Sequence, residues 1–255
     1  MASQSGPACE ERWRHLLQLD EGYKKIISKT WRIRPTYTSN RDMSAWFKLR
    51  HRTLHVAKHN TKHTDGTCMC CNTHLENHIH LMSCDKIQIE FWQPIVNFLM
   101  NKTNMHSPYH LYAFISLGII TKNKIVDNDR ASMIAIAWRV LYATLTNARF
   151  SDPPHSPNLQ EALTRVYVIL HSRIRATAHS QMNQITTTGH TDTPKTINKK
   201  HLRRAFITYE ESGKFTIITA LTSRIKHRMH NSDHTHHHAH ETSDSESLYS
   251  DSEED

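Results

Sequence analysis

The side chains best suited to chemistry are concentrated in one short stretch of the chain. Four of the five cysteines fall between residues 68 and 84, and three histidines lie among them. In a reducing compartment, such clustering indicates metal binding more often than disulfide bonding. Zinc prefers four nitrogen or sulfur ligands in a tetrahedron, and a Cys-x2-Cys turn supplies two of them from one loop. The sequence therefore predicts a zinc site here.

Spacing favours one set of four ligands. Cys68 and Cys71 have the Cys-x2-Cys spacing. His80 and Cys84 are four residues apart, so a helical turn places both on one face. The predicted zinc ligands are Cys68, Cys71, His80 and Cys84. Because the protein supplies all four positions, the site is expected to be closed, and the zinc structural instead of catalytic.

Two neighbouring side chains leave the ligand set open. Cys70 is a reserve thiolate for Cys68, and His78 is a reserve imidazole for His80. Spacing alone does not decide between the members of either pair. In a further interpretation no metal is bound, and the reduced cysteines pack against Trp92.

The sequence lacks the patterns of the common enzyme sites. His74-x-Glu76 has the form of the deaminase His-x-Glu pair, but in deaminases that pair precedes the cysteines and here it follows Cys68 and Cys71. These residues do not form the His-Glu-x-x-His metalloprotease motif either. We find no Gly-rich phosphate loop and no Gly-x-Ser-x-Gly turn. The protein is therefore predicted to be non-enzymatic.

Charge is distributed unevenly along the 255 residues. The net charge is +8, but residues 241–255 hold seven acids and no Lys or Arg, so the first 240 residues hold 32 bases against 17 acids. A body this basic attracts polyanions, and nucleic acid is the commonest of these inside cells. The candidate contacts to RNA or DNA are Arg32, Arg34, Arg50, Arg52, Lys58, Lys199, Lys200, Arg203 and Arg204.

The acidic end of the chain has a pattern typical of phosphorylation sites. Ser243, Ser250 and Ser252 each have an acid three residues further on, which suits an acid-directed kinase. Each phosphate would add up to about two negative charges. We expect this tail to compete with nucleic acid for the basic body, and phosphorylation to strengthen the competition.

Apolar periodicity predicts a mainly α fold. Helices are expected over residues 11–33 (broken near Gly22), 43–59, 87–100 and 108–117, with two longer ones starting at Asp129 and Asn158. The fold class is an irregular helical bundle with a small zinc module and a disordered C-terminal tail. No apolar run reaches the roughly 18 residues that span a bilayer, and no secretory signal is visible, so we expect an intracellular protein in the nucleus or cytoplasm without membrane contact.

The expected domain organisation follows the composition. In order, it comprises a disordered leader (1–10), a basic helical region (11–100) that includes the zinc module (66–92), a helical domain (101–180), a linker (181–198), a basic helical segment (199–230) and a disordered His-rich and acidic tail (231–255). Within the basic segment, Phe215-Thr-Ile-Ile-Thr-Ala is equally compatible with a strand.

The ligand pattern belongs to a longer motif of about 50 residues. It comprises Trp46-Phe-Lys-Leu-Arg-His-Arg-Thr-Leu54, Cys68-x2-Cys71, Glu76-x3-His80, Cys84 and Trp92. Residues 43–95 thus resemble the zinc-binding domain at the C-terminal end of non-LTR retrotransposon reverse transcriptases. The resemblance implies a module that handles nucleic acid. The chain has no Tyr/Phe-x-Asp-Asp pair, so it is not expected to copy nucleic acid, and the additional cysteine and histidine at positions 70 and 78 depart from the family pattern.

The predicted function is a non-enzymatic zinc-binding protein that binds nucleic acid. The alternative is a protein-interaction or regulatory adaptor, viral or element-encoded, that binds a partner protein through the apolar helices at 87–100 and 129–178. Salt distinguishes the two, because polynucleotide affinity falls steeply with salt whereas an apolar interface is largely insensitive to it.

Overall fold

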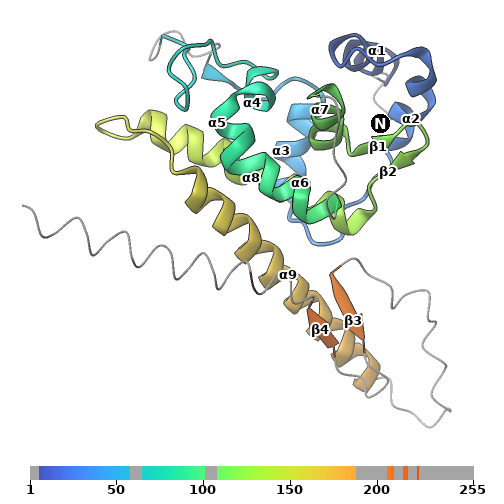
Figure 1. The fold of residues 1–255 in the computed structure, drawn as a ribbon. Coiled ribbons are helices and arrows are strands. Elements are labelled where there is room, and N and C mark those ends of the chain that lie inside the picture. The colour runs from blue at the N-terminus through green and yellow to red at the C-terminus, as the bar shows by residue number, and fades with distance from the viewer. Residues whose placement is uncertain are drawn as a thin grey trace, which may run out of the picture.

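The structure is a computed structural model that describes residues 6–57, 65–100, 108–187, 206–209, 215–217 and 223. It is mainly helical, as predicted, and its described strands form two short antiparallel hairpins (Figure 1). The helices are α1 (Gly6–Leu16), the 3-10 helix η1 (Glu21–Tyr23), α2 (Lys24–Thr30), α3 (Asn40–Arg50), α4 (His80–Ser83), α5 (Asp85–Ile87), the π-helical η3 (Gln88–Trp92), α6 (Gln93–Met100), α7 (Pro108–Leu117), α8 (Asn128–Phe150) and α9 (Leu159–Thr187). The strands are β1 (Ile119–Thr121), β2 (Lys124–Ile125), β3 (Ile207–Tyr209) and β4 (Phe215–Ile217).

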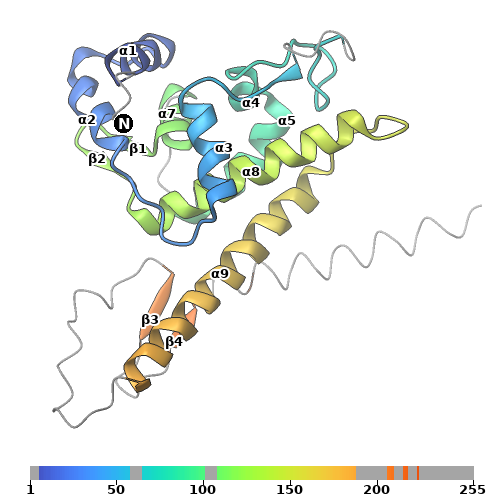
Figure 2. The same cartoon turned by 180° about the vertical axis from the view of Figure 1, so that it is seen from behind.

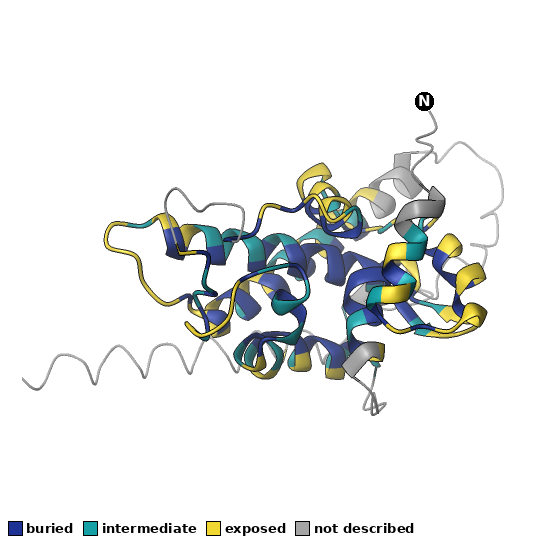
Figure 3. Cartoon of the chain, turned by 90° about the horizontal axis from the view of Figure 1, so that it is seen from above, coloured by how far each residue is buried: buried dark blue, intermediate teal, exposed yellow. Residues whose placement is uncertain are grey.

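Helix α8 is the central element of the body. Asp127 caps its N-terminus, where the carboxylate accepts a hydrogen bond from the backbone N–H of Arg130 at 2.8 Å. The helix packs against both α3 and α9, which lie beside it in Figure 2. Buried side chains from Trp13 to Phe206 form one hydrophobic cluster (Figure 3). The boundary expected at residue 100 therefore does not separate two cores.

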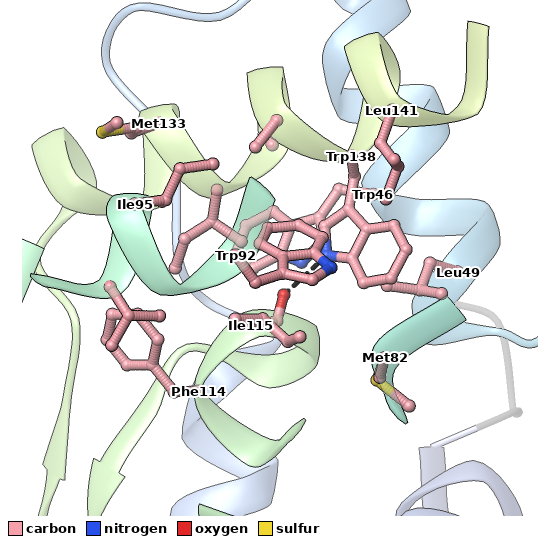
Figure 4. Packing of buried hydrophobic residues seen from close by; sticks show 14 of the residues in the cluster. Trp46, Leu49, Met82, Trp92, Ile95, Phe114, Ile115, Met133, Trp138 and Leu141 are labelled. Atoms are coloured by element: carbon pink, nitrogen blue, oxygen red, sulfur yellow. Dashed lines mark hydrogen bonds between the residues drawn. The ribbon is translucent and has the colours of Figure 1, made fainter. Parts of the chain in front are cut away.

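Three tryptophans fill the middle of this core. Trp92 and Trp138 have ring centroids 4.7 Å apart. The indole N–H of Trp138 donates to the carbonyl of Ile115 at 2.6 Å (Figure 4). The indole N–H of Trp46 donates to the carbonyl of Ser116 at 2.9 Å. Large aromatic side chains bury much apolar area, and these two polar atoms are satisfied at the same time. The tryptophans thereby connect α3, α7 and α8.

A π-helical turn lies within the helical run from Asp85 to Met100. Pro94 has no N–H to donate to the carbonyl of Glu90, and its ring would crowd that carbonyl in a regular α-helix. The N–H of Gln93 instead reaches the carbonyl of Gln88, five residues back. The freed carbonyl of Glu90 accepts a hydrogen bond from Gln160 on α9 at 3.5 Å.

A buried carboxylate fastens α3 to α8 and α9. Asp42, whose side chain has no exposed area, forms a capping box with Ser39 at the start of α3. It also forms ion pairs with Arg139 of α8, at 2.5 Å, and with Arg173 of α9. Arg173 in addition donates to the backbone carbonyl of Tyr37 at 3.1 Å. The two ion pairs join residues 97 and 131 positions apart, and no local sequence pattern indicates them.

The N-terminal part differs from the prediction at two helix ends. α1 begins at Gly6, inside the segment expected to be a disordered leader, and Pro7 in its first turn needs no hydrogen-bond partner. α3 ends at Arg50, nine residues before the expected end. Arg52 has a left-handed φ of 57°, which terminates the helix and turns the chain toward the buried Leu54.

The C-terminal part also differs from the prediction. α9 continues to Thr187, seven residues into the expected linker. Part of the segment expected to be helical, residues 199–230, instead forms the β3–β4 hairpin, in which the strand alternative for Phe215 onward is realised. Strand β4 contacts α9, and the rings of Phe206 and Phe98 stack with their centroids 6.0 Å apart. These contacts fix the hairpin against the body. Within the described residues, no helix is long and apolar enough to cross a membrane.

Candidate metal centre

The first two predicted ligands lie on a narrow turn. Thr67 and Leu75 form an isolated antiparallel bridge at its base. Inside it, the N–H of Cys68 donates to the carbonyl of His74 at 2.9 Å, and the N–H of Asn72 donates to the carbonyl of Cys68 at 2.8 Å. Asn72 has a left-handed φ of 54°, a conformation that asparagine tolerates better than most residues. The turn closes the Cys-x2-Cys spacing.

The other two predicted ligands lie at the two ends of α4. The side-chain oxygen of Asn77 accepts hydrogen bonds from the backbone N–H groups of Ile79 and His80, each at 2.9 Å, and so starts this helical turn. The N–H of Cys84 then donates to the carbonyl of His80 at 2.7 Å. One turn of helix therefore places the imidazole and the thiol on the same side, as the four-residue spacing predicts.

The structure brings the four predicted ligand atoms together. The thiol sulfurs of Cys68, Cys71 and Cys84 and one ring nitrogen of His80 all lie within 4.8 Å of one another. The Cys68 and Cys84 sulfurs are 4.0 Å apart, and the Cys71 sulfur is 3.3 Å from Nε2 of His80. A tetrahedral zinc with Zn–S bonds of about 2.3 Å requires sulfur atoms about 3.8 Å apart. The arrangement has the dimensions of a metal site, and the sulfurs are too far apart for a disulfide.

The two reserve ligands lie outside this group. Nε2 of His78 is 2.9 Å from the backbone carbonyl of Leu54, and the ring is buried there. Cys70 is buried beside the group, and its N–H donates to the sulfur of Cys68 at 3.4 Å. The structure thus selects His80 over His78, and it gives Cys70 the role of a hydrogen-bond donor to a ligand.

The thiols affect one another strongly. Hydrogen bonds from Cys70 and Cys84 hold the pKa of Cys68 far below its usual value, and the hydrogen bond with Cys68, together with burial, raises the pKa of Cys84. For Cys71, burial opposes ionisation, but hydrogen bonds from Thr73 and His74 outweigh it and lower the pKa to about 6. Adjacent thiolates repel one another unless a cation lies between them.

A buried ion pair attaches this loop to the body, and sequence reasoning missed it. One carboxylate oxygen of Glu76 accepts from Arg149 of α8 at 2.6 Å, and the other accepts from the backbone N–H of Ala57 at 2.9 Å. Both charged side chains are 3% exposed. In the sequence, Glu76 is a lone acid inside a Cys/His loop, and Arg149 is an arginine near the end of an apolar helix. Neither feature indicates that the two side chains pair.

The predicted nucleic-acid contacts fall into three groups. Arg32, Arg34 and Arg52 are exposed, as a phosphate contact requires. Arg50 is 5% exposed, so its prediction was wrong: its guanidinium donates to the hydroxyl of Thr30 at 3.1 Å within the core. The predicted contacts that lie outside the described residues are Lys58, Lys199, Lys200, Arg203 and Arg204. The predicted phosphorylation sites Ser243, Ser250 and Ser252 lie outside them too.

Comparison with protein-family models, with curated proteins and with solved structures finds no significant match to this chain.

Proposed function

We propose that residues 66–84 bind one zinc ion in a closed, structural site with a Cys3His ligand set. The observation that carries the proposal is the convergence of four ligand atoms within 4.8 Å. Three sulfurs and one imidazole nitrogen form a soft, tetrahedral donor set, which favours zinc over calcium or magnesium. Cys68 and Cys84 are buried, and four protein ligands leave no position for a substrate. The role of the ion is to hold the turn against α4.

Metal analysis of purified protein tests this proposal with a matched pair of variants. We expect one equivalent of zinc in the wild type and in Cys70→Ser, because Cys70 lies outside the ligand group. Cys71→Ser removes a ligand and is expected to lose most of the zinc. Zinc retained by Cys71→Ser and lost from Cys70→Ser would show that the ligand set is wrong.

We further propose that the helical body binds nucleic acid through the basic surface of its N-terminal region. In residues 10–57, the exposed cations are Arg12, Lys24, Lys25, Lys29, Arg32, Arg34, Arg41, Lys48 and Arg52. Only two acids in that range are exposed, and both are paired elsewhere: Asp20 with Lys122, and Glu21 with the half-buried Arg14. The surface thus has a large uncompensated positive charge, which is the usual basis of phosphate binding.

A salt titration with a labelled oligonucleotide tests this second proposal. Affinity should fall linearly with the logarithm of salt concentration, with a slope set by the number of phosphates contacted. Replacing Arg32 and Arg34 by Gln should reduce that slope by about two. A slope near zero would contradict the proposal.

The adaptor alternative has less support. Most apolar side chains of segments 87–100 and 129–178, which were expected to contact a partner protein, lie in the core of this chain, and Ile89, Phe150 and Val168 are exposed. Kinship with the retroelement zinc domain stays a prediction. Its motif residues Trp46, Glu76 and Trp92 are buried structural residues here, and the comparisons with known proteins do not support the link.

A further inference from the structure

A ladder of side chains in cation–π and tilted ring contacts runs from the buried Trp46 to the exposed Phe47. At its inner end, the guanidinium of Arg50 lies between two indole rings, 4.8 Å from the centroid of Trp46 and 4.2 Å from that of Trp31. The ring of His51 follows, with its centroid 5.0 Å from Trp31. The last ring is Phe47, whose centroid is 4.0 Å from that of His51. Cation–π and ring contacts hold the ladder together.

The inner part of this ladder is fixed by hydrogen bonds. The guanidinium of Arg50 donates to Thr30, and the carbonyl of Arg50 accepts from the indole N–H of Trp13 at 2.6 Å. The indole N–H of Trp46 is held by the carbonyl of Ser116. A ligand that stacked on the outer end would meet a surface that is already ordered, so little conformational entropy would be lost on binding.

The outer end of the ladder is accessible and surrounded by positive charge. Phe47 is 55% exposed, although apolar side chains of this size in the described residues are mostly buried. Lys48 and Arg52 follow it in sequence and are both exposed, and Arg32 is the exposed neighbour of Trp31. Arg52 also lines an open groove of about 610 Å³ with Arg12, His15, Leu16 and Glu11.

The imidazole beneath Phe47 favours its neutral form. Burial, assisted by the nearby charge of Arg50, lowers the pKa of His51 below its usual value. The outer end of the ladder, formed by Phe47 and His51, is therefore uncharged at neutral pH, and the charge of Arg50 lies at the inner end. An uncharged ring with exposed cations nearby is the arrangement that single-stranded nucleic acids meet on stacking surfaces, where rings take the bases and cations take the phosphates.

We propose that Phe47 is a stacking platform for an unpaired base of single-stranded nucleic acid, with Lys48, Arg52 and Arg32 as phosphate contacts. The inference rests on the proposed nucleic-acid function and makes it more specific, because a duplex keeps its bases stacked on one another and out of reach. Every base has a π face, so the platform is expected to tolerate different base sequences.

The test measures binding of the full-length, zinc-loaded protein to a fluorescent oligo(dT) of about 20 nucleotides, and to the same strand in duplex with oligo(dA). Phe47→Ala should weaken single-strand binding by about 5-fold or more, the usual size of one base–aromatic stack, and leave the salt dependence unchanged. Phe47→Tyr should bind as the wild type does. Phe47→Leu keeps the apolar bulk without a ring, so it should lose most of the affinity that Phe47→Ala loses.

Two control variants separate stacking from charge and from general effects. Phe150→Ala removes a phenylalanine of similar exposure, 53%, at the far end of α8 and should leave binding unchanged. Lys48→Gln should weaken binding to single strand and duplex alike and reduce the salt slope by about one. Circular dichroism and zinc content confirm that each variant is folded.

The outcomes distinguish the platform from the broader function. If the wild type binds the single strand and Phe47→Ala or Phe47→Leu binds equally well, the platform is wrong and nucleic-acid binding stands. If Phe47→Ala weakens duplex binding as much as single-strand binding, base stacking is likewise wrong. If the wild type binds neither probe in a salt-dependent way, both proposals fail.

Discussion

The loop that carries the metal ligands and the helical body beside it are stabilised in different ways. The body is held by apolar packing of α3, α8 and α9 around Trp46, Trp92 and Trp138. The loop contributes turns, backbone hydrogen bonds and sulfur atoms, and its firmest link to the body is the ion pair between Glu76 and Arg149. We therefore expect the body to remain folded without a metal, and the conformation of the loop to depend on the proposed ion.

The largest loss of stability is expected from a change in the body. Trp138→Ala removes a buried indole that packs on Trp92 and donates to the carbonyl of Ile115, and it should lower the free energy of unfolding by about 3–5 kcal/mol. Denaturant unfolding measures this loss, with zinc and after its removal. A similar loss in both states is expected, and a loss confined to the zinc-bound state would contradict the independence of the body.

The next effect concerns the link between the two regions. Glu76→Gln leaves the buried guanidinium of Arg149 without its counter-charge, and we expect it to cost up to about 3–5 kcal/mol of stability. The double variant Glu76→Gln/Arg149→Met should recover part of that loss, since no buried charge then remains. Denaturant unfolding of the two single variants and the double variant gives the coupling. Additive losses would show that the pair does not interact as the structure indicates.

Removal of the metal should affect the loop far more than the body. After chelation, we expect the amides of Cys68 and Cys84, which donate to His74 and His80, to lose protection from hydrogen exchange. The amides in the middle of α8 should remain protected. Loss of protection throughout α8 at the same chelator concentration would mean that the body also requires the ion.

The smallest effect is expected at the cap of α3, and it depends on pH. Burial opposes ionisation of Asp42, but hydrogen bonds from Ser39 and the charge of Arg173 outweigh it, and its pKa lies below the usual value. The stability it contributes is fully present above about pH 4, the pKa of an unfolded aspartate, and is lost as pH falls through the lower folded-state pKa. Ser39→Ala should cost about 1 kcal/mol at pH 7.

The Ser39→Ala variant should also change how the free energy of unfolding depends on pH in the acid range. Without the hydroxyl of Ser39 the folded-state pKa of Asp42 lies closer to its unfolded value, so less stability is lost below about pH 4, and the loss is complete at a higher pH than in the wild type. Thermal unfolding between pH 3 and 7 compares the two proteins. Parallel pH profiles would show that Ser39 does not stabilise the carboxylate.

The sequence predicted those features that depend on local spacing. The four ligands follow from two short separations along the chain, and the periodicity of α8 follows from its own residues. Spacing favoured His80 over His78, and the structure confirms it; the contact that holds His78 elsewhere, with the carbonyl of Leu54 24 residues away, could not be predicted. Arg50 was misjudged for the same reason: Thr30, which accepts its hydrogen bond, and Trp31, on whose ring its charge lies, are at the end of α2, Thr30 being 20 residues earlier in the sequence. Partners distant in sequence leave no periodic signal.

X-ray absorption at the zinc edge of the purified protein is the most direct test of the proposed Cys3His zinc site. We expect the zinc to have three sulfur neighbours at about 2.3 Å and one nitrogen neighbour at about 2.0–2.1 Å. Any zinc retained by Cys71→Ser should have one sulfur neighbour fewer, and Cys70→Ser should keep all three. A coordination shell with water or carboxylate oxygen in place of a protein ligand, or protein that contains no zinc, would contradict the proposed site.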